Sequence, residues 1–157
     1  MGFPYKHEMT VAAHCGDRYN SFENTMEAFE AAMLQGADMI ETDVRMTADG
    51  HLVLIHDADT FRTTGERGLV KELTLEQVRK RNAGNALHPL QIPTLEELLA
   101  WAQPHDLLLN IAGSFVVADK LQSEGAGALS HGAQVDGVGG HLGHGNLSLD
   151  GGHAVTG

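Results

Sequence analysis

The run Met39-Ile-Glu-Thr-Asp-Val-Arg-Met-Thr-Ala-Asp-Gly-His-Leu-Val-Leu-Ile-His-Asp57 contains two candidate strands and the turn that joins them. Its first part, Met39 to Val44, has the character of a strand. Asp49-Gly50 is a strong hairpin signal, because glycine supplies the positive φ that a tight turn needs. The returning segment, Leu52 to Ile55, is continuously apolar and leads to His56-Asp57. The run therefore predicts a hairpin whose second strand ends at a histidine and an aspartate.

The segment before this hairpin predicts a short strand and then a helix. Thr10 to His14 is expected to form a buried strand that ends in polar residues. In the following helix, Asn24 is the predicted N-cap, and Glu27 three residues later completes a capping box. Gly36 is expected just beyond the end of this helix, where its backbone can close the last turn.

The segment after the hairpin continues the alternation of helices and strands. Thr74 with Gln77 and Thr94 with Glu97 have the spacing of two further helix starts, each a capping residue followed by a polar partner at the third helical position. Leu107 to Ile111 predicts another buried strand. Strands that alternate with helices indicate an α/β fold with parallel strand pairing.

The chain has 157 residues and a formal net charge of −11. This length is well below the roughly 250 residues of a complete (β/α)8 barrel. The acidic balance argues against sequence-independent binding to nucleic acid and to an anionic membrane face, because both need a basic surface. No apolar run reaches the roughly 18 residues of a membrane span or looks like a signal peptide, so a cytoplasmic location is expected. The single cysteine, Cys15, fits a reducing compartment.

Residues 113–157 differ in composition from the part of the chain before them. They contain 12 of the 19 glycines and four of the ten histidines, with neither a helical nor a strand period after Phe115-Val-Val-Ala118. We expect residues 113–157 to be a disordered or aberrant tail, because such a composition buries little apolar area to offset its ordering entropy. The tail histidines are irregularly spaced among glycines, which favours a solvated segment over a metal site.

Polar clusters lie where the predicted strands end, which is where α/β barrels place their active sites. Glu41 and Asp43 are two residues apart on a strand, so both carboxylates face the same side and can meet one hard cation such as Ca²⁺ or Mg²⁺. His14 and His56 come from separate segments and can supply a general acid and a general base. Each group also has a simpler reading: a structural histidine, or a solvated acidic rim.

The order of these motifs resembles the glycerophosphodiester phosphodiesterase family. Ala-His-x-Gly, Glu-Asn-Thr before a helix, Ile-Glu-x-Asp-Val, Thr-x-Asp-Gly, His-Asp and Arg-Thr-Thr-Gly follow one another between Val11 and Ile111. The resemblance implies a TIM barrel of which this chain holds the amino-terminal portion, residues 1–112, with a small insertion after the second strand at about residues 44–91. It also implies hydrolysis of a glycerophosphodiester to glycerol 3-phosphate and an alcohol, a reaction of lipid metabolism.

By position, the resemblance makes His14 and His56 the acid/base pair and Glu41 and Asp43 metal ligands for Ca²⁺ or Mg²⁺. The family usually has an arginine where this chain has Cys15, and we expect Arg18 to contact the substrate phosphate instead. A nucleophilic role for Cys15 is disfavoured, since no base is dedicated to it.

A second departure from the family pattern begins at Ala112. After Leu-Leu-Asn-Ile the family continues Glu-Leu-Lys, a third metal ligand and a phosphate-binding lysine, where this chain has Ala112-Gly113-Ser114. Two hypotheses follow: a metal-dependent hydrolase, or a truncated, non-catalytic fragment of one. A partial barrel also leaves exposed sheet edges, which self-association can cover.

Overall fold

The computed structural model describes residues 9–105, 107–114, 133–136 and 144–149. The strands of this described part are β1 (Ala12–His14), β2 (Met39–Met46), β3 (Leu52–Leu54), β4 (Leu108–Ser114), β5 (Ala133–Asp136) and β6 (His144–Leu149). The helices are α1 (Met26–Leu34), α2 (Phe61–Thr64), the 3-10 turn η1 (Val70–Glu72), α3 (Leu75–Arg79) and α4 (Leu95–Ala102).

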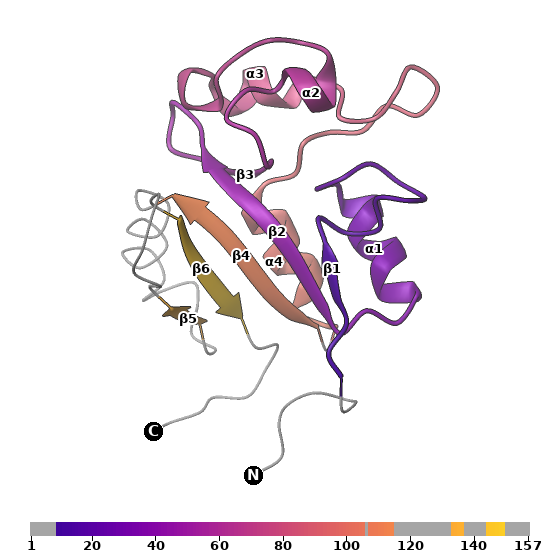
Figure 1. Cartoon of the computed structure of the whole chain (residues 1–157). Coiled ribbons are helices and arrows are strands. Elements are labelled where there is room, and N and C mark those ends of the chain that lie inside the picture. The colour runs from indigo at the N-terminus through magenta and orange to yellow at the C-terminus, as the bar shows by residue number, and fades with distance from the viewer. Residues whose placement is uncertain (1–8, 106, 115–132, 137–143, 150–157) are drawn as a thin grey trace.

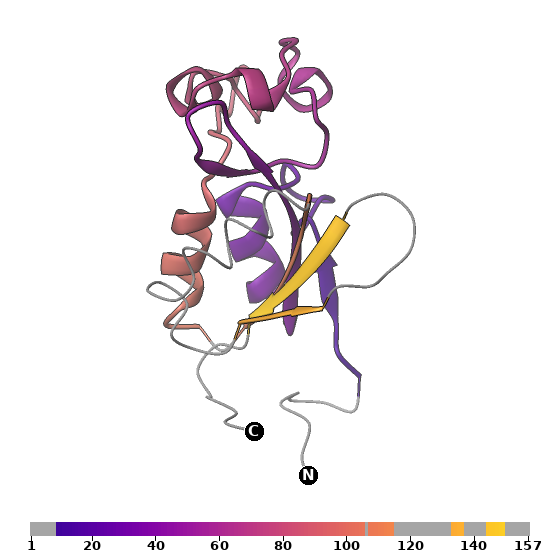
Figure 2. The ribbon, with the colours of Figure 1, turned by 90° about the vertical axis from the view of Figure 1, so that its left-hand side faces the viewer.

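Strands β1, β2 and β4 form a parallel sheet, and the helices that connect them pack against one of its faces. Strand β2 lies between β1 and β4 and is parallel to both. Figures 1 and 2 show α1 and α4 side by side on the same face of this sheet. Parallel strands joined by helices on the sheet face are the repeating unit of a TIM barrel. The predicted α/β fold with parallel strand pairing is therefore confirmed for this portion of the chain.

The main core lies between the sheet and the two helices. Along β2, every second residue is buried, and these are Ile40, Thr42 and Val44. They pack toward α1 and α4, together with the buried aromatic ring of Phe29. Because side chains alternate across a strand, the residues between them, Glu41 and Asp43, point to the opposite face of the sheet.

The predicted hairpin is confirmed, and it begins the insertion. Strand β3 pairs antiparallel with β2, with Val44 opposite Leu54. Gly50 has φ +83° in the connecting turn, which is the conformation the Asp-Gly signal predicts. The insertion then runs through α2, η1 and α3 above the ends of β2 and β4 (Figure 1). It has its own small core, whose buried residues are Val53, Ile55, Val70, Val78, Ala83 and Ile92.

Two of the three predicted helix starts are confirmed, and one is wrong. Thr74 and Thr94 both form complete capping boxes with the polar residues three positions later. For α1, however, the N-cap is Thr25, whose hydroxyl accepts a hydrogen bond from the backbone N–H of Ala28. Asn24 has φ +53°, a left-handed conformation that asparagine tolerates better than most residues, and it lies outside the helix.

Strand β4 runs past the predicted end at Ile111 and continues to Ser114. The antiparallel strand β6 pairs with it from Leu109 to Ser114, and β5 pairs with β6. Residues 133–136 and 144–149 of the predicted tail are thus strands whose backbone groups pair within the sheet, and the expectation of a disordered or aberrant tail stays a prediction. The rest of residues 115–157, including His131, His141 and His153, lies outside the described residues. No helix among the described residues is long and apolar enough to cross a membrane.

Candidate active site

The predicted site residues are brought together at one end of the sheet. His14 is the last residue of β1, and the parallel pairing places it in register with Glu41 on β2. The backbone N–H of Ile55 donates to the carbonyl oxygen of Asp43 at 3.0 Å, so the segment that carries His56 leaves β3 directly beside Asp43. The fold therefore gathers His14, Glu41, Asp43 and His56, although Glu41 and Asp43 lie inside β2 and not at its end.

His14 and Glu41 face each other across β1 and β2. The distance from His14 Nε2 to Glu41 Oε2 is 3.4 Å, and the imidazole is about half exposed. That carboxylate oxygen is buried and has no hydrogen-bond partner among the described residues. Burial and the nearby Asp43 carboxylate raise the pKa of Glu41. A buried carboxylate oxygen without a hydrogen-bond partner is stabilised by a cation or by a proton donor.

His56 is oriented by the residue that follows it. Asp57 Oδ1 lies 2.7 Å from His56 Nδ1, and this hydrogen bond raises the pKa of His56. When Nδ1 donates to the carboxylate, Nε2 is left free to exchange a proton with a substrate. Arg45, two residues beyond Asp43, donates from Nε and Nη2 to the backbone carbonyl of His56 at 2.9 and 2.6 Å.

Cys15 is buried in the corner that follows His14. Its Sγ lies 3.6 Å from Asp43 Oδ2, and its backbone N–H donates to the carbonyl of Glu41 at 2.8 Å. Burial and the surrounding carboxylates raise the pKa of the thiol to about 12, so it is protonated at neutral pH. A protonated thiol is a poor nucleophile, which agrees with the disfavoured nucleophilic role of this residue.

The corner itself depends on Gly16 and Asn24. Gly16 has φ +81°, and a Cβ at this position would lie 2.7 Å from the carbonyl carbon of Ala28 in α1. Asn24 donates its backbone N–H to the carbonyl of Cys15 at 2.9 Å, and its side-chain Oδ1 accepts from the Thr42 hydroxyl at 2.7 Å. Asn24 thus ties the loop after β1 to the middle of β2, a role the N-cap prediction did not include.

Among the described residues, the side chain of Arg18 forms no hydrogen bond or ion pair with His14 or His56. It is exposed in the turn that follows Gly16, where its backbone N–H donates to the Gly16 carbonyl at 3.1 Å. Its charge helps to lower the pKa of Glu23. The predicted contact of Arg18 with a phosphate stays a prediction.

The donors at this site suit a hard divalent cation. His14, Cys15 and Glu41 each place one ligand atom within 4.8 Å of the others. Ca²⁺ and Mg²⁺ prefer oxygen, so the protonated thiol is the poorest donor of this group. Glu41 and Asp43 project from the same face of β2, and Glu41 Oε2, which faces His14 Nε2 at 3.4 Å without a hydrogen bond, is positioned to bind a cation. Two carboxylates are enough for a Mg²⁺ site that keeps waters or substrate oxygens as its other ligands.

The position beside Asp43 on the neighbouring strand carries no third carboxylate. Strand β4 pairs with β2 so that Ala112 is in register with Asp43 and Asn110 with Glu41. Residues in register on parallel strands point to the same face, and Ala112 therefore presents a methyl group there. Ala112, where the sequence departs from the family pattern, therefore lies inside the site, beside Asp43.

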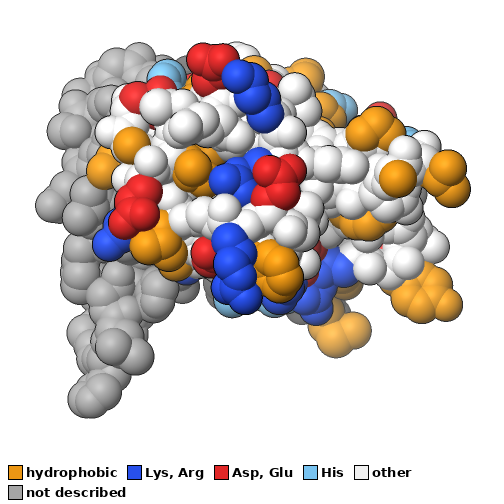
Figure 3. Space-filling model, turned by 90° about the horizontal axis from the view of Figure 1, so that it is seen from above, with side chains coloured by type: hydrophobic (Ala, Val, Ile, Leu, Met, Phe, Trp, Pro, Cys, Tyr) orange, Lys and Arg blue, Asp and Glu red, His pale blue; other side chains and the backbone are white. Residues whose placement is uncertain are grey.

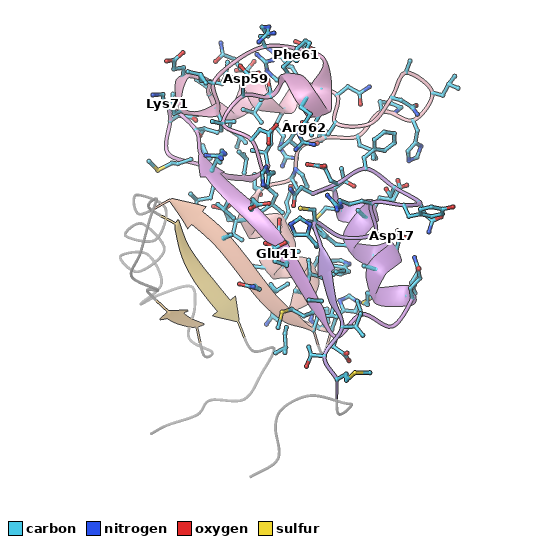
Figure 4. All side chains as sticks on the ribbon, viewed as in Figure 1. Asp17, Glu41, Asp59, Phe61, Arg62 and Lys71 are labelled. Carbon is cyan, nitrogen blue, oxygen red and sulfur yellow. The ribbon has the colours of Figure 1, made fainter. Side chains whose placement is uncertain are left out.

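Arg62, an arginine of the insertion, contacts the site residues but was not predicted from the sequence to belong to the site. Arg62 lies between the insertion and the upper end of the sheet (Figure 4). Its guanidinium binds both Glu23 and Asp57, and Asp57 is the partner of His56. The Arg-Thr-Thr-Gly motif contained this residue, but sequence alone gave no partner for it.

The face of the molecule above the site carries charges of both signs. Figure 3 shows lysine and arginine side chains next to aspartate and glutamate over the insertion, rather than a uniformly acidic surface. This face is therefore less acidic in appearance than the net charge of −11 alone suggests. A mixed surface reduces the repulsion that an anionic substrate meets.

The sequence profile of the glycerophosphoryl diester phosphodiesterase family matches residues 14–131. This match extends past Ile111, where the motif resemblance ends. A glycerophosphodiester phosphodiesterase of Caldanaerobacter subterraneus subsp. tengcongensis is 48% identical over 105 residues, which are 64% of this chain and 43% of that protein. Human glycerophosphodiester phosphodiesterase 1 is 38% identical over 108 residues, 64% of this chain and 32% of that protein. The chain thus spans less than half the length of these relatives.

Solved structures of similar proteins superpose on the same region. A glycerophosphodiester phosphodiesterase from Agrobacterium tumefaciens has a TM-score of 0.66 at 31% identity, covering 74% of this chain and 54% of that one. A phosphodiesterase from Oleispira antarctica, solved in complex with its product sn-glycerol-3-phosphate, has a TM-score of 0.62 at 31% identity. That similarity covers 66% of this chain and 43% of the Oleispira chain.

Proposed function

Because the chain belongs to the glycerophosphoryl diester phosphodiesterase family, we propose that it hydrolyses glycerophosphodiesters to glycerol 3-phosphate and an alcohol. The observation that carries this proposal is the convergence of two histidines and two carboxylates at one end of the sheet. His14 faces Glu41, and the segment with His56 lies against Asp43. Residues 1–112 are assigned to this enzyme domain, with residues 44–91 as its insertion.

Glu41 and Asp43 are the residues that would hold a divalent cation, Ca²⁺ or Mg²⁺. When bound, such an ion offsets the negative charge of the phosphate and lowers the pKa of an attacking hydroxyl. The support for this assignment is the pair of same-face carboxylates with one orphaned oxygen. Arg18, exposed in the turn after Gly16, is proposed to add a positive charge for the phosphate.

His14 and His56 are proposed to move the protons of the reaction. The hydroxyl of the glycerol group attacks phosphorus and gives its proton to one histidine, while the other histidine gives a proton to the departing alkoxide. Because its partner Asp57 raises its pKa, His56 stays protonated over a wider pH range, so we assign it the role of acid and His14 the role of base. Water then opens the cyclic phosphate with the two roles exchanged.

A direct assay tests this proposal. The purified full chain is incubated with glycerophosphocholine and Mg²⁺ or Ca²⁺, and release of glycerol 3-phosphate is measured. His14→Ala and His56→Ala are each expected to lower kcat by roughly 10²- to 10⁴-fold, the usual contribution of general acid–base catalysis. His51→Ala, which removes an exposed histidine of the β2–β3 turn, is the matched control and is expected to retain wild-type activity.

One observation favours the alternative, a non-catalytic fragment of such an enzyme. Ala112 stands in register with Asp43 where a third carboxylate is expected from the resemblance. If the wild-type chain and His14→Ala release glycerol 3-phosphate equally slowly, the enzyme proposal fails and the fragment alternative is preferred.

A further inference from the structure

Arg62 joins two segments that are far apart in the sequence. Its Nη1 and Nη2 donate to the two carboxylate oxygens of Glu23 at 2.9 and 2.6 Å. Its Nε donates to Asp57 Oδ2 at 2.6 Å, and Nη2 also reaches Asp57 Oδ1 at 3.3 Å. One planar guanidinium therefore uses two of its edges on two carboxylates, the fork geometry that only arginine offers.

The two carboxylates belong to the two segments that carry the histidines. Glu23 lies in the loop that leaves β1 at His14 and returns to the start of α1. Asp57 directly follows His56 and accepts its Nδ1–H at 2.7 Å. Continuous hydrogen bonds thus run from Glu23 through Arg62 and Asp57 to the imidazole of His56.

Stability alone is a weak explanation for this arrangement. The Arg62 side chain is 49% exposed, and solvent screening weakens the contribution that its ion pairs make to folding. Its partners are more sheltered, with 17% exposure for Glu23 and 32% for Asp57. Hydrogen bonds from Arg62 are the main reason that the pKa of Glu23 is lowered and that the pKa of Asp57 falls to about 2. Both partners therefore stay charged. Besides stabilising the two charged carboxylates, the arrangement fixes their positions relative to each other.

We propose that Arg62 is a positioning residue that fixes Asp57, and through it the imidazole of His56, relative to the loop that begins at His14. This inference rests on the proposed function, in which His14 and His56 act on the same substrate. Arg62 touches neither reacting group, so it acts through Asp57. Arg62 lies in α2 of the insertion, so this segment supplies both His56 and the residue that sets the position of His56 relative to His14.

The first test does not depend on activity. Long-range ¹H–¹⁵N correlation spectra of the full-length ¹⁵N-labelled chain report which nitrogen of the neutral His56 ring carries the proton, with His56→Gln used for assignment. In the wild type we expect the Nδ1–H form, because Asp57 accepts from Nδ1. In Arg62→Ala we expect a mixture of both forms, since Asp57 has lost the group that orients it. Arg67→Ala, which removes an arginine stacked on Phe61 in the same insertion, is expected to match the wild type.

The second test uses the phosphodiesterase assay. Arg62→Ala is expected to lower kcat on the order of a hundredfold with KM changed less than about threefold, because misplacement of a catalytic group mainly affects the chemical step. Guanidinium ion at non-denaturing concentration is expected to restore part of the kcat of Arg62→Ala and to leave Arg67→Ala unchanged. Arg62→Lys, which keeps the charge without the fork, is expected to stay close to Arg62→Ala.

The outcomes separate the two proposals. If Arg62→Ala is folded by circular dichroism and His56 keeps the wild-type tautomer, the positioning role is wrong, whatever happens to activity. An unchanged kcat in Arg62→Ala also overturns it. If the tautomer shifts while the wild-type chain shows no hydrolysis, the positioning of His56 is supported and the proposed function fails.

Discussion

Ala112 lies directly beside Asp43, because the parallel pairing of β4 with β2 places these two residues in register. Both side chains point to the face of the sheet that carries Glu41. The family resemblance puts a glutamate at the position of Ala112, and in this fold such a side chain starts next to the two existing carboxylates. One methyl group therefore occupies the place of a potential ligand.

Replacing Ala112 by glutamate is expected to strengthen binding of Mg²⁺ or Ca²⁺ by about tenfold or more, because a third carboxylate adds both charge and an oxygen ligand. Isothermal titration of the metal-free chain and the variant measures the change. Ala112→Gln has nearly the same shape without the charge and is expected to bind metal like the wild type. Equal affinities for the glutamate and glutamine variants would show that position 112 does not face the cation.

The thiol of Cys15 is expected to react slowly with alkylating reagents. Its pKa of about 12, against a usual 9.0, lowers the thiolate fraction near pH 8 by roughly a thousandfold. We expect the native chain in EDTA to react with iodoacetamide at least about a hundredfold more slowly than the chain unfolded in urea. Mass spectrometry of timed samples gives both rates, and similar rates would contradict the buried, protonated thiol.

The Asp57 carboxylate makes folding stability depend on pH in the acid range. Its pKa in the folded chain is about 2, below the usual 3.8, so its contribution is complete above about pH 4 and is lost as the pH falls through about 2. The stability difference between the wild type and Asp57→Asn is therefore expected to shrink between pH 5 and pH 2. Urea unfolding at several pH values measures it.

The same measurement in an Arg62→Gln background provides the control for Asp57. Arg62 is the first cause of the lowered pKa, so its removal is expected to weaken the pH dependence of the difference. A pH dependence that is equally strong without Arg62 would show that another group stabilises the carboxylate.

Gly16→Ala is expected to destabilise the chain by about 2 kcal/mol or more, because it combines a left-handed backbone with a contact against α1. Gly36→Ala is the matched control, since Gly36 also has positive φ but an added Cβ there meets nothing within 4 Å. Gly36→Ala is expected to cost only the backbone part, about 1 kcal/mol. Equal losses in urea unfolding would mean that the contact between Gly16 and Ala28 relaxes freely.

The elements that local patterns specify were predicted from the sequence. The Asp-Gly turn, the capping boxes at Thr74 and Thr94 and the strand-helix alternation all depend on residues within a few positions of each other. The convergence of His14, Glu41, Asp43 and His56 was also predictable, because β1 and β2 are parallel neighbours and the Asp-Gly turn returns β3 along β2 toward Asp43.

Contacts between distant segments were not predictable. Asn24 and Thr25 are both good capping residues, and the choice between them depends on the hydrogen bond from Thr42 to Asn24 across 18 positions. The partners of Arg62 include Glu23, 39 positions away. Pairing of β6 with β4 was likewise missed, because the glycine-rich segment has no strand period of its own.

The hairpin of β2 and β3 has a consequence for how the site assembles. The two histidines and the two carboxylates all come from one uninterrupted segment, residues 14–57, and the return of β3 along β2 brings His56 toward Asp43. His14 and Glu41 are 27 residues apart and meet by parallel pairing, whereas the hairpin brings His56 beside Asp43 over only 13 residues. Local contacts form faster than distant pairings, because loop-closure entropy rises with loop length. The hairpin that places His56 beside Asp43 is therefore expected to form before the pairing that brings His14 to Glu41.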